Sequence, residues 1–326
     1  MIKKKAAIII LVARKNIFIK SIKNFYKNWN NKYNYPVYVH TFGKIFTDSE
    51  KIEIKNVISP YIFFFEIKPK IPNNIPEKEL FYNRKYNQYV IKNFSKKRLG
   101  FLHMCYFASN ITSFGKPGCL VKDLKNYDYL MRIDDDSLIK KKINFDLFDK
   151  LKKYPLGTAR LNISNKKHYL LVREKLLSFL KKFFISQKIV IKNKILHDSI
   201  KKNDENLLLK IPYSLGNFDL YNMKIIKSSI FDKYIKRVNL FGGQYKYRWG
   251  DMEIINLFFY AFYKKPIYDF KFGKDIYIDK VKGALPVYYS PFTEKYNFNL
   301  NSFYHFYLKI RKLLTYKFFY NFLKIN

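Results

Sequence analysis

Cysteine is scarce in this sequence, with only Cys105 and Cys119 among 326 residues. A fold stabilised by a network of disulfides is therefore excluded, and a reducing compartment is the simpler interpretation. Long apolar runs are absent too. Residues 6–13 are apolar over about half the length that spans a bilayer, they end at Arg14 and Lys15, and no evident small-residue cleavage site follows. We therefore expect a buried first strand, no signal peptide or transmembrane helix, and a protein that is cytoplasmic or peripheral to a membrane.

Carboxylates are outnumbered: 25 Asp and Glu residues face 63 Lys and Arg residues, which gives a net charge of +38. This excess favours anionic partners such as nucleic acid, a membrane surface or nucleotide phosphates. Lys, Ile, Asn, Phe and Tyr are enriched together, however, as an A+T-rich gene would produce for any function, so the charge is weak evidence. The absence of helix-turn-helix, zinc-finger or RNP signatures disfavours nucleic acid as a partner. A non-catalytic protein that binds nucleic acid or an anionic membrane is the alternative from another class.

A folded α/β domain over residues 1–326 is expected, because hydrophobic residues make up 48% of the chain and no repeat or flexible linker interrupts it. Strand-like runs alternate with amphipathic segments. The lysine-rich segment 166–210 is typical of an insertion or a peripheral pair of helices. The expected strands are 6–13, 36–41, 61–67 and 127–133, a further apolar run is 213–220, and the expected helices are 17–30, 83–95, 101–109, 146–153, 224–236 and 251–263.

The C-terminal segment, residues 300–326, interleaves aromatic residues with lysine and arginine. Such a basic aromatic helix can lie on an anionic membrane surface, although packing against the domain is the commoner outcome.

The most informative motif is a triplet of carboxylates, Asp134, Asp135 and Asp136, directly after the apolar run 127–133. Ligands of open α/β sheets bind at the carboxyl ends of strands. Three adjacent carboxylates are stable mainly beside positive charge, and hard oxygen ligands suit Mg²⁺ or Mn²⁺, which could hold a diphosphate. The alternative is a solvated turn or a helix cap.

A second motif, FGGQYKYRWGD, occupies residues 241–251 and precedes an apolar helix. Gly242 and Gly243 permit a tight turn or a close approach of the backbone to a ligand, and Asp251 could be an N-cap. A cap alone would explain only the aspartate.

Here the sequence resembles glycosyltransferase family 15, the fungal-type alpha-1,2-mannosyltransferases. The family's Gly-Gly, four-residue spacer and Arg-Trp-Gly-Asp match this chain residue for residue. Its Arg-Val-Glu-Pro-Asp strand end resembles residues 132–136, and further matches in the same order are Asn34–Tyr35–Pro36, His103–Met104–Cys105 and Gly216–Asn217–Phe218–Asp219.

The resemblance implies a GT-A (Rossmann-like) nucleotide-sugar-binding fold with a mixed, mostly parallel sheet. It also implies a retaining alpha-1,2-mannosyltransferase that uses GDP-mannose and Mn²⁺ or Mg²⁺ on a glycan or glycoprotein acceptor. A glycosyltransferase that uses another sugar-nucleotide donor, or that inverts the anomeric configuration, is the alternative. The implied roles are metal and ribose binding for Asp134 and Asp136, catalysis for Asp219 and Asp251, diphosphate contacts for Arg14 and Arg132, and further donor contacts for Gly242, Gly243, Arg248 and Trp249. For each arginine the plain alternative is a surface salt bridge, and for each catalytic aspartate it is a capping or turn residue.

Four departures from the family pattern bear on activity. Asp135 replaces a proline, Asp219 is one methylene shorter than the family's glutamate, and Tyr106 replaces an arginine. The stretch 267–278 lacks the family's metal-ligating histidine, so metal binding is expected to rely on carboxylates and water or to be weaker; an inactive member is the alternative. His103 is expected to be a packed core histidine.

Overall fold

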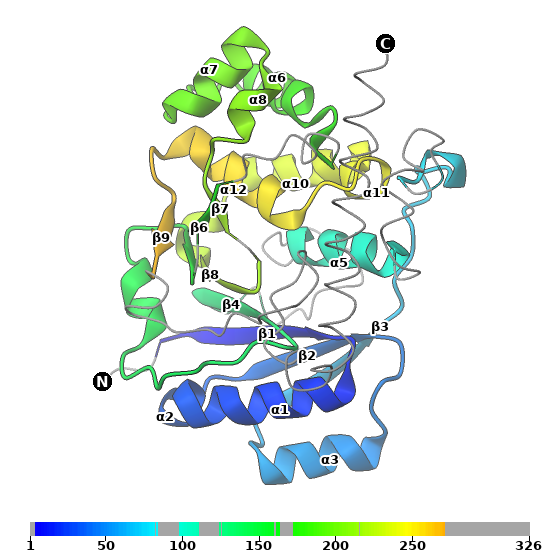
Figure 1. The fold of residues 1–326 in the computed structure, drawn as a ribbon, viewed down its shortest axis with the longest axis vertical. Helices are drawn as coiled ribbons and strands as arrows, with labels where there is room; N and C mark the ends of the chain where they lie inside the picture. The colour runs from blue at the N-terminus through cyan, green and yellow to red at the C-terminus, as the bar shows by residue number, and fades with distance from the viewer. Residues whose placement is uncertain are drawn as a thin grey trace, which may run out of the picture.

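The computed structural model describes residues 4–81, 83, 98–110, 124, 126–159, 161–163, 172–214 and 216–270. Their central element is a seven-stranded sheet in the order β3-β2-β1-β4-β8-β5-β9, beside a two-stranded ribbon of β6 and β7 (Figure 1). The strands are β1 Ala6–Val12, β2 Val37–Phe42, β3 Ile62–Ile67, β4 Tyr129–Asp134, β5 Leu156–Thr158, β6 Leu161–Asn162, β7 Tyr213–Ser214, β8 Phe218–Asn222 and β9 Ile267–Asp269. The four strands expected before residue 134 are confirmed, with small shifts at their ends.

Strand directions place a switch point in the middle of the sheet. β1 pairs in parallel with β2 and with β4, and β2 pairs in parallel with β3. β8 is antiparallel to both of its neighbours, β4 and β5, and β9 is parallel to β5. The chain leaves β1 toward β2 on one side, while β4 lies on the other side, so the carboxyl ends of β1 and β4 form the position where α/β sheets bind ligands. The expected mixed, mostly parallel sheet is confirmed.

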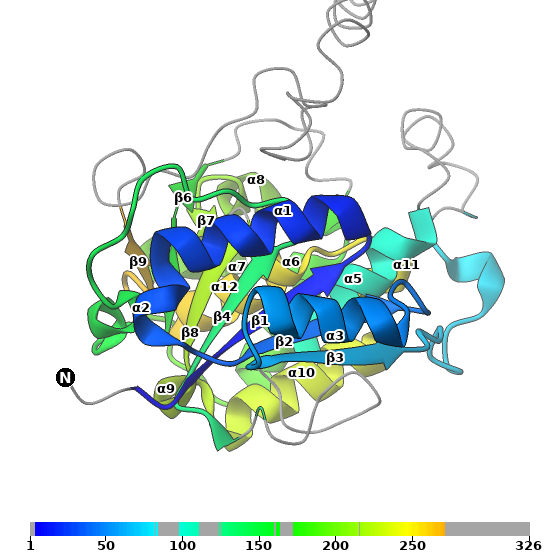
Figure 2. The same ribbon diagram turned by 90° about the horizontal axis from the view of Figure 1, so that it is seen from below.

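The apolar run of β1 is explained by burial on both faces of the sheet. Ala7 and Ile9 join one core cluster, whereas Ile8 and Ile10 join the other. Successive strand residues point to opposite faces, so a strand covered on both sides is apolar throughout. Figures 1 and 2 show the two layers, with α1 and α3 on one face and α5, α10 and α12 on the other.

Helices occupy most of the segments where the sequence predicts them. The helix expected over 17–30 is α1 followed by one π-helical turn at Tyr26–Asn30, and the helix expected over 251–263 is α12. The helices are α1 Lys15–Phe25, α2 Asn31–Tyr33, α3 Asp48–Val57, α5 Arg98–Asn110, α6 Leu176–Ser186, α7 Lys194–Lys202, α8 Glu205–Leu208, α9 Met223–Ile226, α10 Ser229–Phe241, α11 Gly243–Lys246 and α12 Asp251–Phe262.

Two helix predictions need correction. The segment 224–236 is not one helix, because the chain breaks at Lys227 and Ser228 caps the start of α10 by accepting a hydrogen bond from the Phe231 amide. The segment 146–153 forms a short 3₁₀ turn, Leu147–Leu151, with Asp146 as its cap. The helix expected over 83–95 lies outside the described residues apart from Asn83, and so does the whole C-terminal helix expected over 300–326.

The lysine-rich segment 166–210 contains three helices in its described part, namely α6, α7 and α8. α6 is not peripheral, because Leu176, Leu180 and Phe184 are buried in the larger core cluster. Within the described residues, every helix is too short or too polar to cross a membrane.

Candidate active site

The turn after β4 is bound to the end of β1 through Asp135. One carboxylate oxygen, Oδ2, accepts the backbone N–H groups of Ala13 and Arg14, each at 3.0 Å, and the other, Oδ1, accepts Arg14 Nη2 at 2.5 Å. Asp135 is 4% exposed. It therefore joins the two strand ends at the switch point and satisfies amides at the start of α1 that have no helical partner. Where the family has a proline, this chain has a carboxylate that builds the turn.

Arg14 contacts the next carboxylate as well. Its Nη2 lies 2.5 Å from Asp136 Oδ2, and Asp136 is buried. Ser137 continues the turn, donating its hydroxyl to the Asn217 carbonyl at 3.1 Å. Arg14 thus supplies the positive charge that the aspartate triplet requires, and its guanidinium remains about one third exposed at the strand ends.

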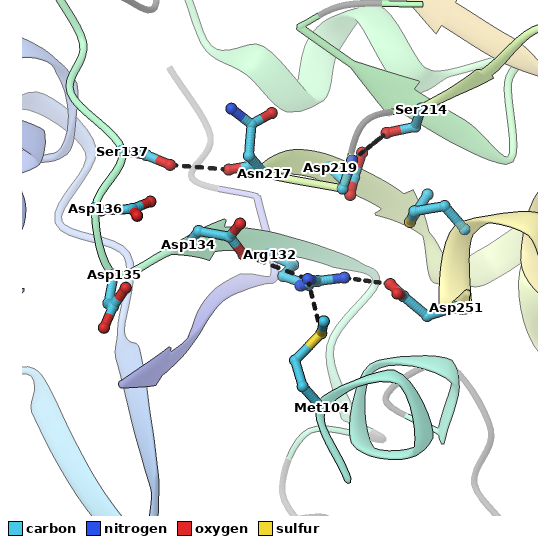
Figure 3. Close-up of polar contacts among 12 residues, drawn as sticks. Met104, Arg132, Asp134, Asp135, Asp136, Ser137, Ser214, Asn217, Asp219 and Asp251 are labelled. Carbon is cyan, nitrogen blue, oxygen red and sulfur yellow. Dashed lines mark hydrogen bonds and ion pairs between the residues drawn. The ribbon is translucent and has the colours of Figure 1, made fainter. Parts of the chain in front are cut away.

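Arg132 is a buried cation between two motifs that are far apart in the sequence (Figure 3). One guanidinium nitrogen, Nη1, donates to Asp251 at the start of α12, and the other, Nη2, donates to Asp134 at 3.3 Å. The same Nη2 lies 3.5 Å from the sulfur of Met104 on α5. Arg132 is therefore no surface salt bridge: it connects the acidic turn with the Trp-Gly-Asp motif.

Asp219 lies beside Arg132, because the pairing of β8 with β4 places these two residues opposite each other. The Ser214 hydroxyl donates to Asp219 Oδ1, whereas Oδ2 is buried without a hydrogen-bond partner among the described residues. Burial raises the pKa of Asp219 to about 7, although Arg132 and Ser214 oppose the shift. Burial also raises the pKa of Asp134 to about 7 and that of Asp251, again against the effect of Arg132. A cluster of carboxylates with raised pKa values is typical of a functional site.

Asp251 is not the N-cap that its sequence position suggested. Gly250 is the cap residue, and Asp251 is the first residue of α12, with its carboxylate engaged by Arg132. Sequence reasoning also missed Ser214, because a single serine within an apolar run carries no signal until β7 and β8 are placed. Met104 belongs to a matched motif, but its contact with Arg132 could not be predicted.

The Gly-Gly and Arg-Trp residues form a packed corner between α10 and α12. Gly242 ends α10 with a φ of +74°, which favours glycine. Gly243 lies against Trp249, whose indole nitrogen donates to the Glu174 carbonyl at 2.8 Å. The Arg248 guanidinium lies 4.2 Å from the centre of the Phe101 ring. These contacts give the motif a packing role, and its contacts with a donor stay a prediction. His103 is packed as expected, with Nδ1 2.9 Å from the Tyr245 hydroxyl.

Asp134 and Asp136 fit a divalent cation by chemistry, as hard oxygen donors from one turn. Within the described residues, no three His, Cys, Asp or Glu side chains converge as a metal site. Mg²⁺-type cations commonly use one or two carboxylates and take their other ligands from substrate phosphates and water. Any such ion would share Asp136 with Arg14.

Two solved structures share this fold. Core-mannan synthase A from Aspergillus fumigatus, in its Mn/GDP form, superposes with a TM-score of 0.67 at 18% identity, over 85% of this chain and 75% of that one. The mannosyltransferase Ktr4p from S. cerevisiae, in complex with GDP, gives a TM-score of 0.68 at 21% identity, over 90% of this chain and 79% of that one. The fold is thus the GT-A fold of glycosyltransferases.

Residues 1–276 match the family model described as glycolipid 2-alpha-mannosyltransferase. The chain belongs to this family, glycosyltransferase family 15. It is 25% identical over 267 residues to alpha-1,2 mannosyltransferase KTR1 from Saccharomyces cerevisiae, an alignment that covers 77% of this chain. The chain spans 63% of the length of that relative.

Replacing Gly243 by alanine should destabilise the corner between α10 and α12. A Cβ at this position would lie 1.9 Å from Trp249 Cε3, so the indole ring must move. We expect Gly243→Ala to lower the free energy of unfolding by about 3 kcal/mol or more in urea titrations. Gly100→Ala is the matched control, because an added Cβ in α5 meets no atom within 4 Å. Equal stability of the two variants would contradict this packing role.

Asp135→Asn should loosen the junction of β1 and β4. The side-chain amide has one acceptor oxygen, so its NH₂ group must face either the two backbone N–H donors or the Arg14 guanidinium. We expect a loss of about 2–4 kcal/mol in the free energy of unfolding, measured in urea. Asp149→Asn, which removes a surface pair with Lys4 at 2.9 Å, should cost less than about 1 kcal/mol. A loss at Asp135 no larger than that control would show that the junction does not depend on this carboxylate.

Proposed function

We propose that this chain is a metal-dependent mannosyltransferase that transfers mannose from GDP-mannose to a glycan or glycoprotein acceptor with retention of anomeric configuration. Support comes from the family match over residues 1–276 and from the similarity to alpha-1,2 mannosyltransferase KTR1. Two structures of the same fold were solved with GDP, one of them with Mn as well. The observation that carries the proposal is the gathering of Asp134, Asp219 and Asp251 around the buried Arg132 at the switch point.

This arrangement suits the charges of glycosyl transfer. As the bond between the sugar and the phosphate breaks, positive charge develops at the sugar and negative charge on the departing diphosphate. Arg132 and Arg14 are fixed cations near the strand ends, and Arg14 is partly exposed. Asp219 has a buried carboxylate oxygen without a hydrogen-bond partner among the described residues, and this oxygen would stabilise or attack the sugar carbon once a donor sugar reaches it.

Asp134 and Asp136 are the proposed metal ligands. Bound Mn²⁺ would neutralise charge on the diphosphate. Arg14 holds Asp136 in place on the turn. Asp251 would accept a sugar hydroxyl or the proton of the acceptor, and Arg132 fixes its position. Gly242, Gly243, Arg248 and Trp249 would contribute to donor binding through the corner that they build.

A donor screen tests the reaction class. Purified protein is incubated with Mn²⁺ and GDP-mannose, UDP-glucose, UDP-galactose or UDP-N-acetylglucosamine, and donor hydrolysis and thermal shift are recorded. We expect GDP-mannose alone to be hydrolysed and to stabilise the protein, and both effects to be lost in Asp134→Ala/Asp136→Ala and with EDTA. Turnover of another donor would move the proposal to that sugar nucleotide. No response to any donor would overturn it.

Asp219→Asn should separate catalysis from stability. The amide keeps the shape of the side chain but removes the charge, so we expect turnover of the active donor to fall about 100-fold or more. Burial raises the pKa of Asp219 from its ordinary 3.8 to about 7. The folded wild type therefore loses stability relative to the variant as the pH rises from about 4 to 7, and at pH 8 the variant should unfold at the same or a higher temperature.

Asp146→Asn is the matched control for this variant. Asp146 is also buried, but it accepts hydrogen bonds from the Tyr35 hydroxyl at 2.7 Å and the Phe148 amide at 3.0 Å, in the other core cluster. It should lose stability and keep its turnover number. Full activity of Asp219→Asn would exclude Asp219 from the chemistry, whatever its stability.

A further inference from the structure

The segment between α6 and α7, residues 187–193, presents one apolar side chain, Val190, to solvent. It turns at Lys188, which has a φ of +52°, and from there to Asn193 exposed and partly buried residues alternate. Ile189 and Ile191 pack against the larger core cluster, whereas Val190 points the other way and is 85% exposed. Lys188 and Lys192, two residues before and two residues after Val190, are exposed as well. We call this segment the α6–α7 loop.

Backbone hydrogen bonds hold the α6–α7 loop in place. The Lys192 amide donates to the Ala261 carbonyl at 2.8 Å, and the Asn193 side chain donates to the Lys264 carbonyl at 3.1 Å. Ala261 lies in the last turn of α12, and Lys264 follows the end of this helix. The exposure of Val190 is therefore a fixed property of the fold.

Along the chain, the charge around this loop has one sign. The chain carries no carboxylate between Glu174 and Asp198. On α6, Ile185 is 64% exposed and lies three residues after an exposed lysine, so the two share one face of the helix. The exposed lysines around the loop are Lys182, Lys188, Lys192 and Lys194, with Lys264 and Lys265 at the end of α12.

Another surface of the molecule makes a contrast. Ile52 and Val57 on α3 are 59% and 63% exposed, similar to Ile185. α3 also carries Asp48, Glu50 and Glu53, so its exposed apolar residues lie among charges of both signs.

We propose that the α6–α7 loop docks on an anionic lipid bilayer, with Val190 and Ile185 entering the headgroup region and the surrounding lysines contacting lipid phosphates. Exposed apolar side chains framed by lysine are the combination that anionic bilayers attract, because apolar burial and charge attraction act together. The loop adjoins the carboxyl end of α12, about 18 Å along the helix from Asp251. Docking there would leave the candidate active site free at the other end of α12. The docking proposal does not depend on the proposed function.

Insertion of the loop can be measured with a tryptophan probe. Both native tryptophans, Trp29 and Trp249, are buried. In V190W, vesicles of phosphatidylserine and phosphatidylcholine should shift the added indole fluorescence to the blue, and brominated acyl chains should quench it. V57W on α3 is the control, and its indole should show neither the blue shift nor the quenching. A general attraction between a basic protein and an anionic membrane would not insert α3 into the bilayer. Equal responses of the two variants, or no quenching of V190W, would overturn the proposal.

Co-sedimentation with the same vesicles separates the apolar and charged contributions. Ile185→Ser/Val190→Ser should bind more than about tenfold more weakly than the wild type. Lys188→Gln/Lys192→Gln should lose about fivefold in affinity for the vesicles per lysine replaced, and added salt should reduce the difference in affinity from the wild type. Ile52→Ser/Val57→Ser should bind like the wild type. Unchanged vesicle binding of the loop variants would refute docking through this loop. It would also be refuted if inorganic phosphate or an oligonucleotide displaced the loop variants from the vesicles as strongly as it displaces the wild type.

Discussion

The buried guanidinium of Arg132 is the interaction on which the candidate site depends. It joins Asp134 at the end of β4 to Asp251 at the start of α12, which lies 119 residues after Arg132 in the chain, and it faces Asp219 across the β4–β8 pairing. A buried cation is stable only when its charge is compensated, and each carboxylate here is stable only beside a cation. Removing Arg132 would leave these carboxylates without their shared cation, so position and charge in this site are set together.

Asp135 and Arg14 form a second connection, which joins the end of β1 to the turn after β4. Asp135 has a structural role, because its two carboxylate oxygens accept three hydrogen bonds from Ala13 and Arg14. Asp134 and Asp136, on either side of it, keep carboxylate oxygens at the strand ends. Three identical neighbours in the sequence therefore divide into one structural and two candidate ligand residues, according to the direction that the turn gives to each side chain.

The sequence allowed the four parallel strands and the location of the candidate site to be predicted, because buried parallel strands are apolar throughout and the acidic triplet begins where one of them ends. It did not predict β5, β6 or β9, which are only two or three residues long. It could not show which aspartate faces which partner, since that depends on the pairing of β4 with β8. Nor could it show that Asp251 follows the cap instead of being the cap, or that Gly243 is small because Trp249 occupies the space beside it. The break at Ser228 was missed because the apolar spacing continues across it. Periodicity detects a buried face, whereas a cap depends on a single hydrogen bond.

The charge balance around Arg132 bears on what the site can bind. One guanidinium faces Asp134, Asp219 and Asp251, so full ionisation leaves a surplus of two negative charges in a buried region. Such a surplus costs stability. Burial disfavours the charged form and raises the pKa values of all three carboxyl groups, and repulsion between the carboxylates adds to this shift. A ligand that brings positive charge would relieve the cost, whether as a divalent cation beside Asp134 or as a sugar that becomes cationic when its bond to phosphate breaks. Folding therefore leaves the site short of positive charge, and binding of such a species favours the ionised carboxylates that glycosyl transfer would require.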